Sequence, residues 1–221
     1  MRRIVGVLVL VFIILPVVYI ASEAVRTLAV LDSVERERDT WQRPGDVLQR
    51  LELSPGQNVV DFGSGAGYFA LKIAPRVAPN GRVFAIDLRR QSLAFLWIRA
   101  MLGRHWNLHI IRSEVDDPQL PPVPLDAVLI ANTYHELSAP DSILKILFTS
   151  MRSGARLVVV DRAPRAGQES RAEAATHHEL TAAAAEAEIT RHGFQTMGRE
   201  DRFIDRAADE DIWWLIVFRK P

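Results

Sequence analysis

The chain has 221 residues, of which 48% are hydrophobic and 24% are charged, a composition typical of a globular protein and not of a disordered one. Its 27 basic residues balance 27 acidic ones, which argues against a general nucleic-acid-binding protein, because such proteins carry a basic excess. The chain has no cysteine, which excludes disulfides, zinc–thiolate sites, iron–sulfur clusters and cysteine nucleophiles.

The N-terminus carries a long apolar segment. Ile4 to Ala21 is an uncharged run of 18 residues that follows Arg2 and Arg3. A helix of that length covers roughly 27 Å, close to the hydrocarbon core of a thin bilayer. We therefore predict a retained transmembrane helix, a signal anchor, over residues 1–22. A cleaved signal peptide and a buried core helix are the alternatives, although the apolar run is long for a signal peptide.

Two helices are expected between this segment and the main domain. Residues 23–52 form a linker with N-terminal cap helices. The first part of this linker is mixed in charge, as in a solvated helix. The second part begins at Pro44, and its residues Val47, Leu48 and Leu51 recur at the spacing of one helical face.

Residues 53–221 alternate between short apolar runs and helical stretches, which predicts an α/β domain with a mostly parallel sheet covered on both faces. Ligands of such sheets bind at the carboxyl ends of the strands, so functional residues are expected just after each run. The predicted strands are 58–62, 83–86, 108–111, 127–131, 156–160 and 213–218. The predicted helices are 68–77, 91–102, 140–151 and 180–192.

The segment after the first strand is rich in glycine. Asp61 and Phe62 are followed by Gly63, Ser64, Gly65, Ala66 and Gly67, and then by a helix. Glycines permit positive φ and let a ligand lie against bare backbone. Tyr68 stands where a dinucleotide fingerprint needs its third glycine, and no Gly-Lys-Ser/Thr sequence supports a phosphate loop.

A second acidic residue ends the next strand. Asp87 lies twenty positions after Gly67, and a carboxylate there can accept both hydroxyls of a ribose. The two features together indicate an adenosine-containing ligand without a diphosphate. An ordinary strand–helix turn and a helix N-cap at Asp87 are the structural alternatives.

These residues resemble those of the class I S-adenosylmethionine-dependent methyltransferases. VVDFGSGAGYFALKIA resembles the first motif of that family, and GRVFAIDL, which ends at Leu88, resembles its second strand. The resemblance covers about residues 41–219. It implies a Rossmann-like, doubly wound sheet of seven strands and S-adenosylmethionine as the cofactor.

The resemblance also implies a set of cofactor-binding residues. The glycine loop with Ser64 would lie against the methionine part, Asp61 would hold the amino group, and Asp87 would bind the ribose, with Leu88 beside it. Glu114 is the best match for the acid that contacts adenine, with Asp116 as the rival, and a solvated loop acid is the alternative for both. Asn132 is placed at the methionine end.

The methyl acceptor is expected after the fourth strand, in Asn132-Thr133-Tyr134-His135-Glu136. Methyl transfer is a direct displacement, so alignment of the reactants and removal of a proton are the main tasks. His135 is the candidate base or acceptor-orienting residue, and Tyr134 is a second catalytic candidate. The alternative is that His135 caps the next segment and Tyr134 packs. Thr133 departs from the Asn/Asp-Pro-Pro-Tyr motif, which argues against amide-nitrogen acceptors.

Three further residues are candidates near the acceptor. His178 and Trp41 are placed at the substrate, and His177 could equally face solvent. Thr181 is expected to cap the following helix. A metal site of His135, His177 and His178 lacks ligand spacing, so no metal is predicted.

We therefore expect a membrane-anchored enzyme that transfers the methyl group of S-adenosylmethionine to a small-molecule or lipid-like acceptor. A non-catalytic cofactor-binding or scaffold module is the alternative, and a nicotinamide oxidoreductase is disfavoured by Tyr68. A cytosolic cofactor predicts a catalytic domain on the cytoplasmic face, whereas Arg2 and Arg3 favour the reverse orientation. Nucleic acid is not expected as a partner, and the oligomeric state is left open.

Overall fold

The computed structural model describes residues 12, 14–165, 176–206 and 210–221. The chain forms two compact units, Met1–Trp41 and Gln42–Pro221, which are described separately.

The first unit contains helix α2 (Leu15–Trp41), which confirms the helix predicted before Trp41. Within the described residues, no helix is both long enough and apolar enough to cross a membrane. Most of the predicted anchor, residues 1–22, lies outside the described residues, and the described part does not support it. The anchor stays a prediction.

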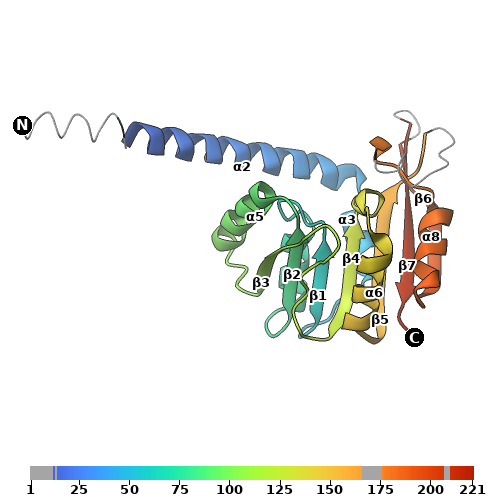
Figure 1. Ribbon diagram of the computed structural model, residues 1–221. Coiled ribbons are helices and arrows are strands. Elements are labelled where there is room, and N and C mark those ends of the chain that lie inside the picture. The colour runs from blue at the N-terminus through green and yellow to red at the C-terminus, as the bar shows by residue number, and fades with distance from the viewer. Residues whose placement is uncertain (1–11, 13, 166–175, 207–209) are drawn as a thin grey trace, which may run out of the picture. The chain divides into compact units, whose positions relative to one another are not determined.

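The second unit is built on a seven-stranded sheet, counted over the described ranges, with the order β3-β2-β1-β4-β5-β7-β6 (Figure 1). Strands β1 to β5 pair in parallel, and β7 runs antiparallel to both of its neighbours, so the sheet is mixed. The strands are β1 (Asn58–Phe62), β2 (Arg82–Asp87), β3 (Leu108–Arg112), β4 (Leu125–Ala131), β5 (Met151–Arg162), β6 (Gln195–Arg206) and β7 (Asp211–Arg219).

Strand β6 was not among the predicted strands. It lies at the edge of the sheet and pairs only with β7 among the described strands. Most of its side chains are exposed, and only Phe203 and Ile204 are buried. An edge strand of this kind needs no apolar run, so the pattern that marks the other strands is missing here.

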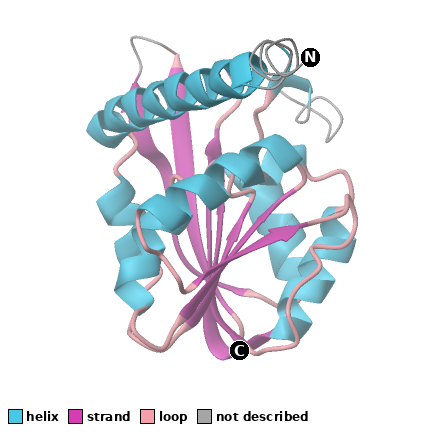
Figure 2. Ribbon diagram, turned by 90° about the vertical axis from the view of Figure 1, so that its left-hand side faces the viewer, coloured by secondary structure: helices cyan, strands magenta, loops and turns pink. Residues whose placement is uncertain are grey.

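Helices lie on both faces of the sheet, as the view along it shows (Figure 2). Helices α4 and α5 pack on β1 to β3, whereas α6 packs on β5 and α8 packs on β6 and β7. Thr181 caps α8 as predicted, because its hydroxyl accepts a hydrogen bond from the Ala184 N–H at 3.1 Å. The helical segments are α3 (Pro44–Arg50), α4 (Ala70–Val77), α5 (Arg90–Leu102), the 3₁₀ turn η2 (Tyr134–Glu136), α6 (Pro140–Ser150) and α8 (Ala182–Arg191).

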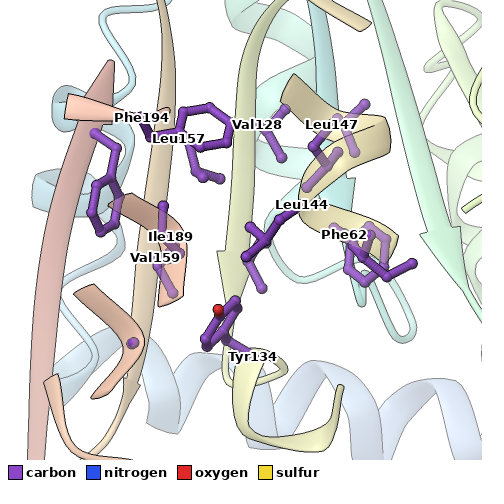
Figure 3. Packing of buried hydrophobic residues seen from close by; sticks show 14 of the residues in the cluster. Phe62, Val128, Tyr134, Leu144, Leu147, Leu157, Val159, Ile189 and Phe194 are labelled. Carbon is purple, nitrogen blue, oxygen red and sulfur yellow. The ribbon is translucent and has the colours of Figure 1, made fainter. Parts of the chain in front are cut away.

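The core on the α6 and α8 face holds the sheet rigid beneath the strand ends. Val128 of β4 and Val159 of β5 are fully buried, and Leu144 and Ile189 cover them from α6 and α8 (Figure 3). Tightly packed side chains of this kind resist displacement. The loops at the carboxyl ends of β1 to β5 therefore start from fixed positions.

The turn after β1 is fixed by hydrogen bonds and by close packing. The N–H groups of Gly63 and Ser64 both donate to the Ile86 carbonyl, at 2.8 and 2.9 Å. Gly63 has φ 76°, and a Cβ atom there would lie 2.1 Å from Oγ1 of Thr133. Only glycine fits, because the Thr133 side chain fills the space a Cβ would need.

We expect Gly63→Ala to lower the free energy of unfolding more than Gly154→Ala. Gly154 has φ 83°, close to that of Gly63, but a Cβ there would meet nothing within 4 Å. Both variants carry the cost of positive φ, about 1–2 kcal/mol, and only Gly63→Ala adds overpacking, about 1–3 kcal/mol more. Urea unfolding measures both. Equal losses would show that Thr133 moves aside freely.

Candidate active site

A pocket opens at the carboxyl ends of the first four parallel strands. The chain order reverses at β1, which has β2 on one side and β4 on the other, and such a switch point leaves a crevice for ligands. The lining residues come from the loops after all four strands: Phe62, Gly63, Ile86, Asp87, Leu88, Arg89, Ser113, Glu114, Val115, Thr133, Glu136, Leu137 and Ser138.

Asp87 is the buried acid of this pocket. Its side chain is 5% exposed, and its two oxygens accept hydrogen bonds from the N–H groups of Gly65 and Arg89, both at 2.8 Å. A carboxylate has about four acceptor positions, so two remain for the hydroxyls of a bound ribose. The structure thus lets Asp87 brace the glycine loop and bind a ligand at once.

The glycine loop leaves room for a cofactor. A Cβ at Gly65 would meet nothing within 4 Å, so the backbone there borders open space. Ser64 Oγ is buried and has no hydrogen-bond partner among the described residues. An open backbone beside an unsatisfied hydroxyl fits the polar methionine end of S-adenosylmethionine.

The other predicted cofactor residues lie at different depths. Leu88 and Glu114 line the pocket, as a contact with adenine requires, whereas Asp116 does not. Asp61 is buried in β1, two residues before Gly63, and is not itself a lining residue. Asn132 has φ 53° and donates its N–H to the Val160 carbonyl at 2.8 Å, outside the pocket lining.

His135 is held by a buried carboxylate. Its Nδ1–H donates to Oδ1 of Asp161 at 2.7 Å, and its backbone N–H donates to Oδ2 of the same side chain at 2.9 Å. His135 is 1% exposed, and Asp161 is fully buried. The two bonds fix the orientation of the ring and direct Nε2 away from Asp161.

This environment changes the proton affinity of the ring. Burial by itself lowers the pKa of His135, but the hydrogen bond to Asp161 and the nearby Glu136 carboxylate outweigh it and raise the pKa to about 9. The contact with His135 in turn lowers the pKa of Glu136. With this pKa the ring carries a proton on each nitrogen at neutral pH and can donate from Nε2.

Asp161 was missed by the sequence analysis. It directly follows the predicted strand 156–160, at the carboxyl end of a parallel strand. The rule that functional residues follow the apolar runs applies to it, but no motif in the sequence distinguishes it. Its pairing with His135 joins β5 to the turn η2, 26 positions apart in the chain.

His178 and Glu136 complete a cluster around Nε2 of His135. Nδ1 of His178 lies 3.2 Å from that atom, and Oε1 of Glu136 lies 3.7 Å from it. His178 has φ 57°, an uncommon backbone conformation. Glu136 lines the pocket, so the cluster stands at the β4 side of the cofactor site.

Two other candidates have different surroundings. Tyr134 is fully buried among the core residues, and its hydroxyl donates to Oε2 of Glu188 on α8 at 2.8 Å (Figure 3). The structure thus places its side chain in the core and not in the pocket lining. Trp41 is the last residue of α2 in the first unit, and His177 is exposed next to His178.

Comparison with known proteins identifies the family of the chain. A family model described as a methyltransferase domain matches residues 53–207. Protein-L-isoaspartate O-methyltransferase of Aeropyrum pernix is 44% identical over 43 residues, 20% of this chain and 16% of that protein. Ubiquinone/menaquinone biosynthesis C-methyltransferase of Vibrio campbellii is 25% identical over 111 residues, 48% of this chain and 42% of that protein. The matched segments span less than half of these relatives.

Solved structures show the same fold. A SAM-dependent methyltransferase from Aquifex aeolicus has a TM-score of 0.72 and 20% identity, over 89% of this chain and 98% of that one. Phosphoethanolamine N-methyltransferase 2 of Haemonchus contortus, in complex with S-adenosyl-L-methionine, has a TM-score of 0.68 and 14% identity, over 82% of this chain and 53% of that one.

We expect Asp87→Ala to raise the Kd for S-adenosylmethionine at least about tenfold, because hydrogen bonds to a charged group contribute roughly 1.5–3 kcal/mol each. Isothermal titration calorimetry measures the change. Asp116→Ala is the matched control, since Asp116 is an exposed acid outside the pocket lining. An unchanged Kd in a folded Asp87→Ala protein would refute the assignment.

Proposed function

The chain belongs to the methyltransferase domain family, with S-adenosylmethionine as its cofactor, and from this premise we propose that it methylates a small, lipid-like acceptor. The proposal rests on one observation, that the cofactor pocket and the buried His135–Asp161 pair lie next to each other. The Asp87 pocket lies at the ends of β1 to β3, and the His135–Asp161 pair lies beside its β4 side.

The residues of the pocket have separate tasks in this proposal. Asp87 binds the ribose, Leu88 and Glu114 contact the adenine, and the glycine loop with Ser64 and Asp61 surrounds the methionine end. S-Adenosylmethionine supplies a methyl group on a sulfonium sulfur, which an electron-rich acceptor atom displaces. The chain contributes mainly the alignment of the two reactants.

His135 orients the acceptor. With a pKa of about 9, its ring is protonated at neutral pH and donates a hydrogen bond from Nε2. An oxygen of the acceptor receives this bond in place of Nδ1 of His178, which lies 3.2 Å from Nε2, and is then held beside Glu136, at the wall of the cofactor pocket. Asp161 keeps the ring in place, because a rotated ring would remove the side-chain donor of this buried carboxylate and leave it only the backbone N–H groups of His135 and Arg162.

The acceptor proposed here is hydroxylated and largely apolar. Leu137 gives the β4 side of the pocket an apolar wall, which suits a ring or a hydrocarbon body. The relative from Vibrio campbellii is named for ubiquinone and menaquinone biosynthesis, which supports a quinol-like acceptor.

A membrane location belongs to the same proposal. The uncharged run from Ile4 to Ala21 supports a single-pass anchor over residues 1–22, and a lipid-like acceptor would reside in the membrane. The catalytic domain would lie on the cytoplasmic face, where S-adenosylmethionine is available.

The activity is tested with the full chain in detergent, S-adenosylmethionine and a panel of polyprenyl hydroquinones that lack a ring methyl group. We expect release of S-adenosylhomocysteine to rise at least about tenfold over the rate without acceptor, since a bound nucleophile reacts faster than water. Asp87→Ala should lose this rate and Asp116→Ala should keep it. Cofactor binding without turnover on any acceptor, including extracts of the source membranes, would favour the non-catalytic binding module.

The orientation is tested by a reporter fused after Pro221. We expect the reporter to be active only on the cytoplasmic side, and removal of residues 1–22 should release the protein from the membrane fraction, because that run supplies the apolar anchor. A reporter active outside would contradict the proposed location.

A further inference from the structure

The cluster of His135, His178 and Glu136 has the composition of a metal site. Two imidazole nitrogens and one carboxylate oxygen are the ligands of many catalytic zinc sites and of non-haem iron(II) sites. Sequence spacing did not reveal this set, because it pairs adjacent residues of η2 with a residue 43 positions away. The third ligand is Glu136 and not the neighbouring His177.

The three ligand atoms are already spaced for a metal ion. His135 Nε2 and His178 Nδ1 lie 3.2 Å apart, and Oε1 of Glu136 lies 3.7 Å from the first and 3.5 Å from the second. The circle through these three atoms has a radius of about 2.0 Å, the length of zinc–nitrogen and zinc–oxygen bonds. An ion near its centre lies within bonding distance of all three atoms.

The outer contacts of the cluster also match a metal site. A metal-binding histidine usually donates its other ring N–H to a carboxylate, which fixes the tautomer and the direction of the ring. Asp161 does this for His135, at 2.7 Å and in full burial. The arrangement leaves Nε2, facing Glu136 and His178, as the coordinating atom.

The site is open on one side. The His135 side chain is 1% exposed, whereas the side chains of His178 and Glu136 are 60% and 47% exposed. Three protein ligands with an accessible fourth position are typical of catalytic and not structural zinc sites. Because Glu136 also lines the pocket, the open position lies next to the cofactor site.

We propose that His135 Nε2, His178 Nδ1 and Glu136 Oε1 bind one divalent transition-metal ion, with a coordination position left for an oxygen of the acceptor. The metal site itself does not depend on the proposed function, but its role in binding the acceptor rests on it. Hydroxyl or carboxylate oxygens are the acceptor groups that such an ion would hold.

The test uses the full chain without a polyhistidine tag, stripped with a chelator and titrated with Zn²⁺ and Co²⁺. We expect one ion per chain, and Co²⁺ should give the visible absorption of a four- or five-coordinate ion. His178→Ala and Glu136→Gln should weaken binding at least about 100-fold, and Asp161→Asn about 10- to 100-fold. His192→Ala is the matched control, because His192 pairs with Asp141 at 2.7 Å and is not one of the three clustered residues.

Two results would overturn the proposal: no saturable binding by the folded chain, or binding that both His178→Ala and Glu136→Gln leave unchanged. Circular dichroism checks the fold, and if one variant unfolds the other decides. Asp87→Ala should lose S-adenosylmethionine but retain Co²⁺, whereas His178→Ala should lose Co²⁺ but retain S-adenosylmethionine. A failure of the metal site is thereby distinguished from a failure of the proposed function.

Discussion

The two hydrogen bonds that the Ile86 carbonyl accepts from Gly63 and Ser64 set the geometry of the cofactor pocket. They turn the chain off the end of β1 and hold the loop against β2. The loop then reaches Asp87, which accepts the Gly65 N–H, and presses Gly63 against Thr133 after β4. One turn therefore ties together the ends of three strands, and the cofactor pocket forms where they meet.

The His135 side of the site, where we propose that the acceptor binds, depends on a different constraint, the burial of the Asp161 carboxylate. An isolated charge in the interior costs several kcal/mol unless hydrogen bonds and an opposite charge compensate it. The Nδ1–H and backbone N–H of His135 supply the bonds, and the imidazolium supplies the charge. The same requirement explains why the pKa of His135 is raised.

The cofactor half of the site is predictable from the sequence because its signals are local. Its features lie within 30 positions of one another: the apolar run of β1, the glycines after it and Asp87 at the end of β2. Each of them is recognised from a backbone conformation or from its place at the end of a strand. Strands β1 to β5 and β7 are predicted for the same reason. The exposed edge strand β6 carries no such run. Tyr134 illustrates the limit, since nothing local shows that its hydroxyl meets Glu188 in the core.

The proposed acceptor side of the site cannot be predicted from local sequence signals. His135, Asp161 and His178 come from η2, the end of β5 and the segment before α8, so only the folded sheet brings them together. A substitution in one of these three segments can alter the site without disturbing the turn that binds the cofactor. Methyltransferase folds that share a cofactor can therefore differ in their acceptors, and here the difference would reside in Glu136 and His178. These two side chains are exposed and still converge on Nε2 of the buried His135 ring. This convergence at the edge of the cofactor pocket is the physical reason to assign them to chemistry.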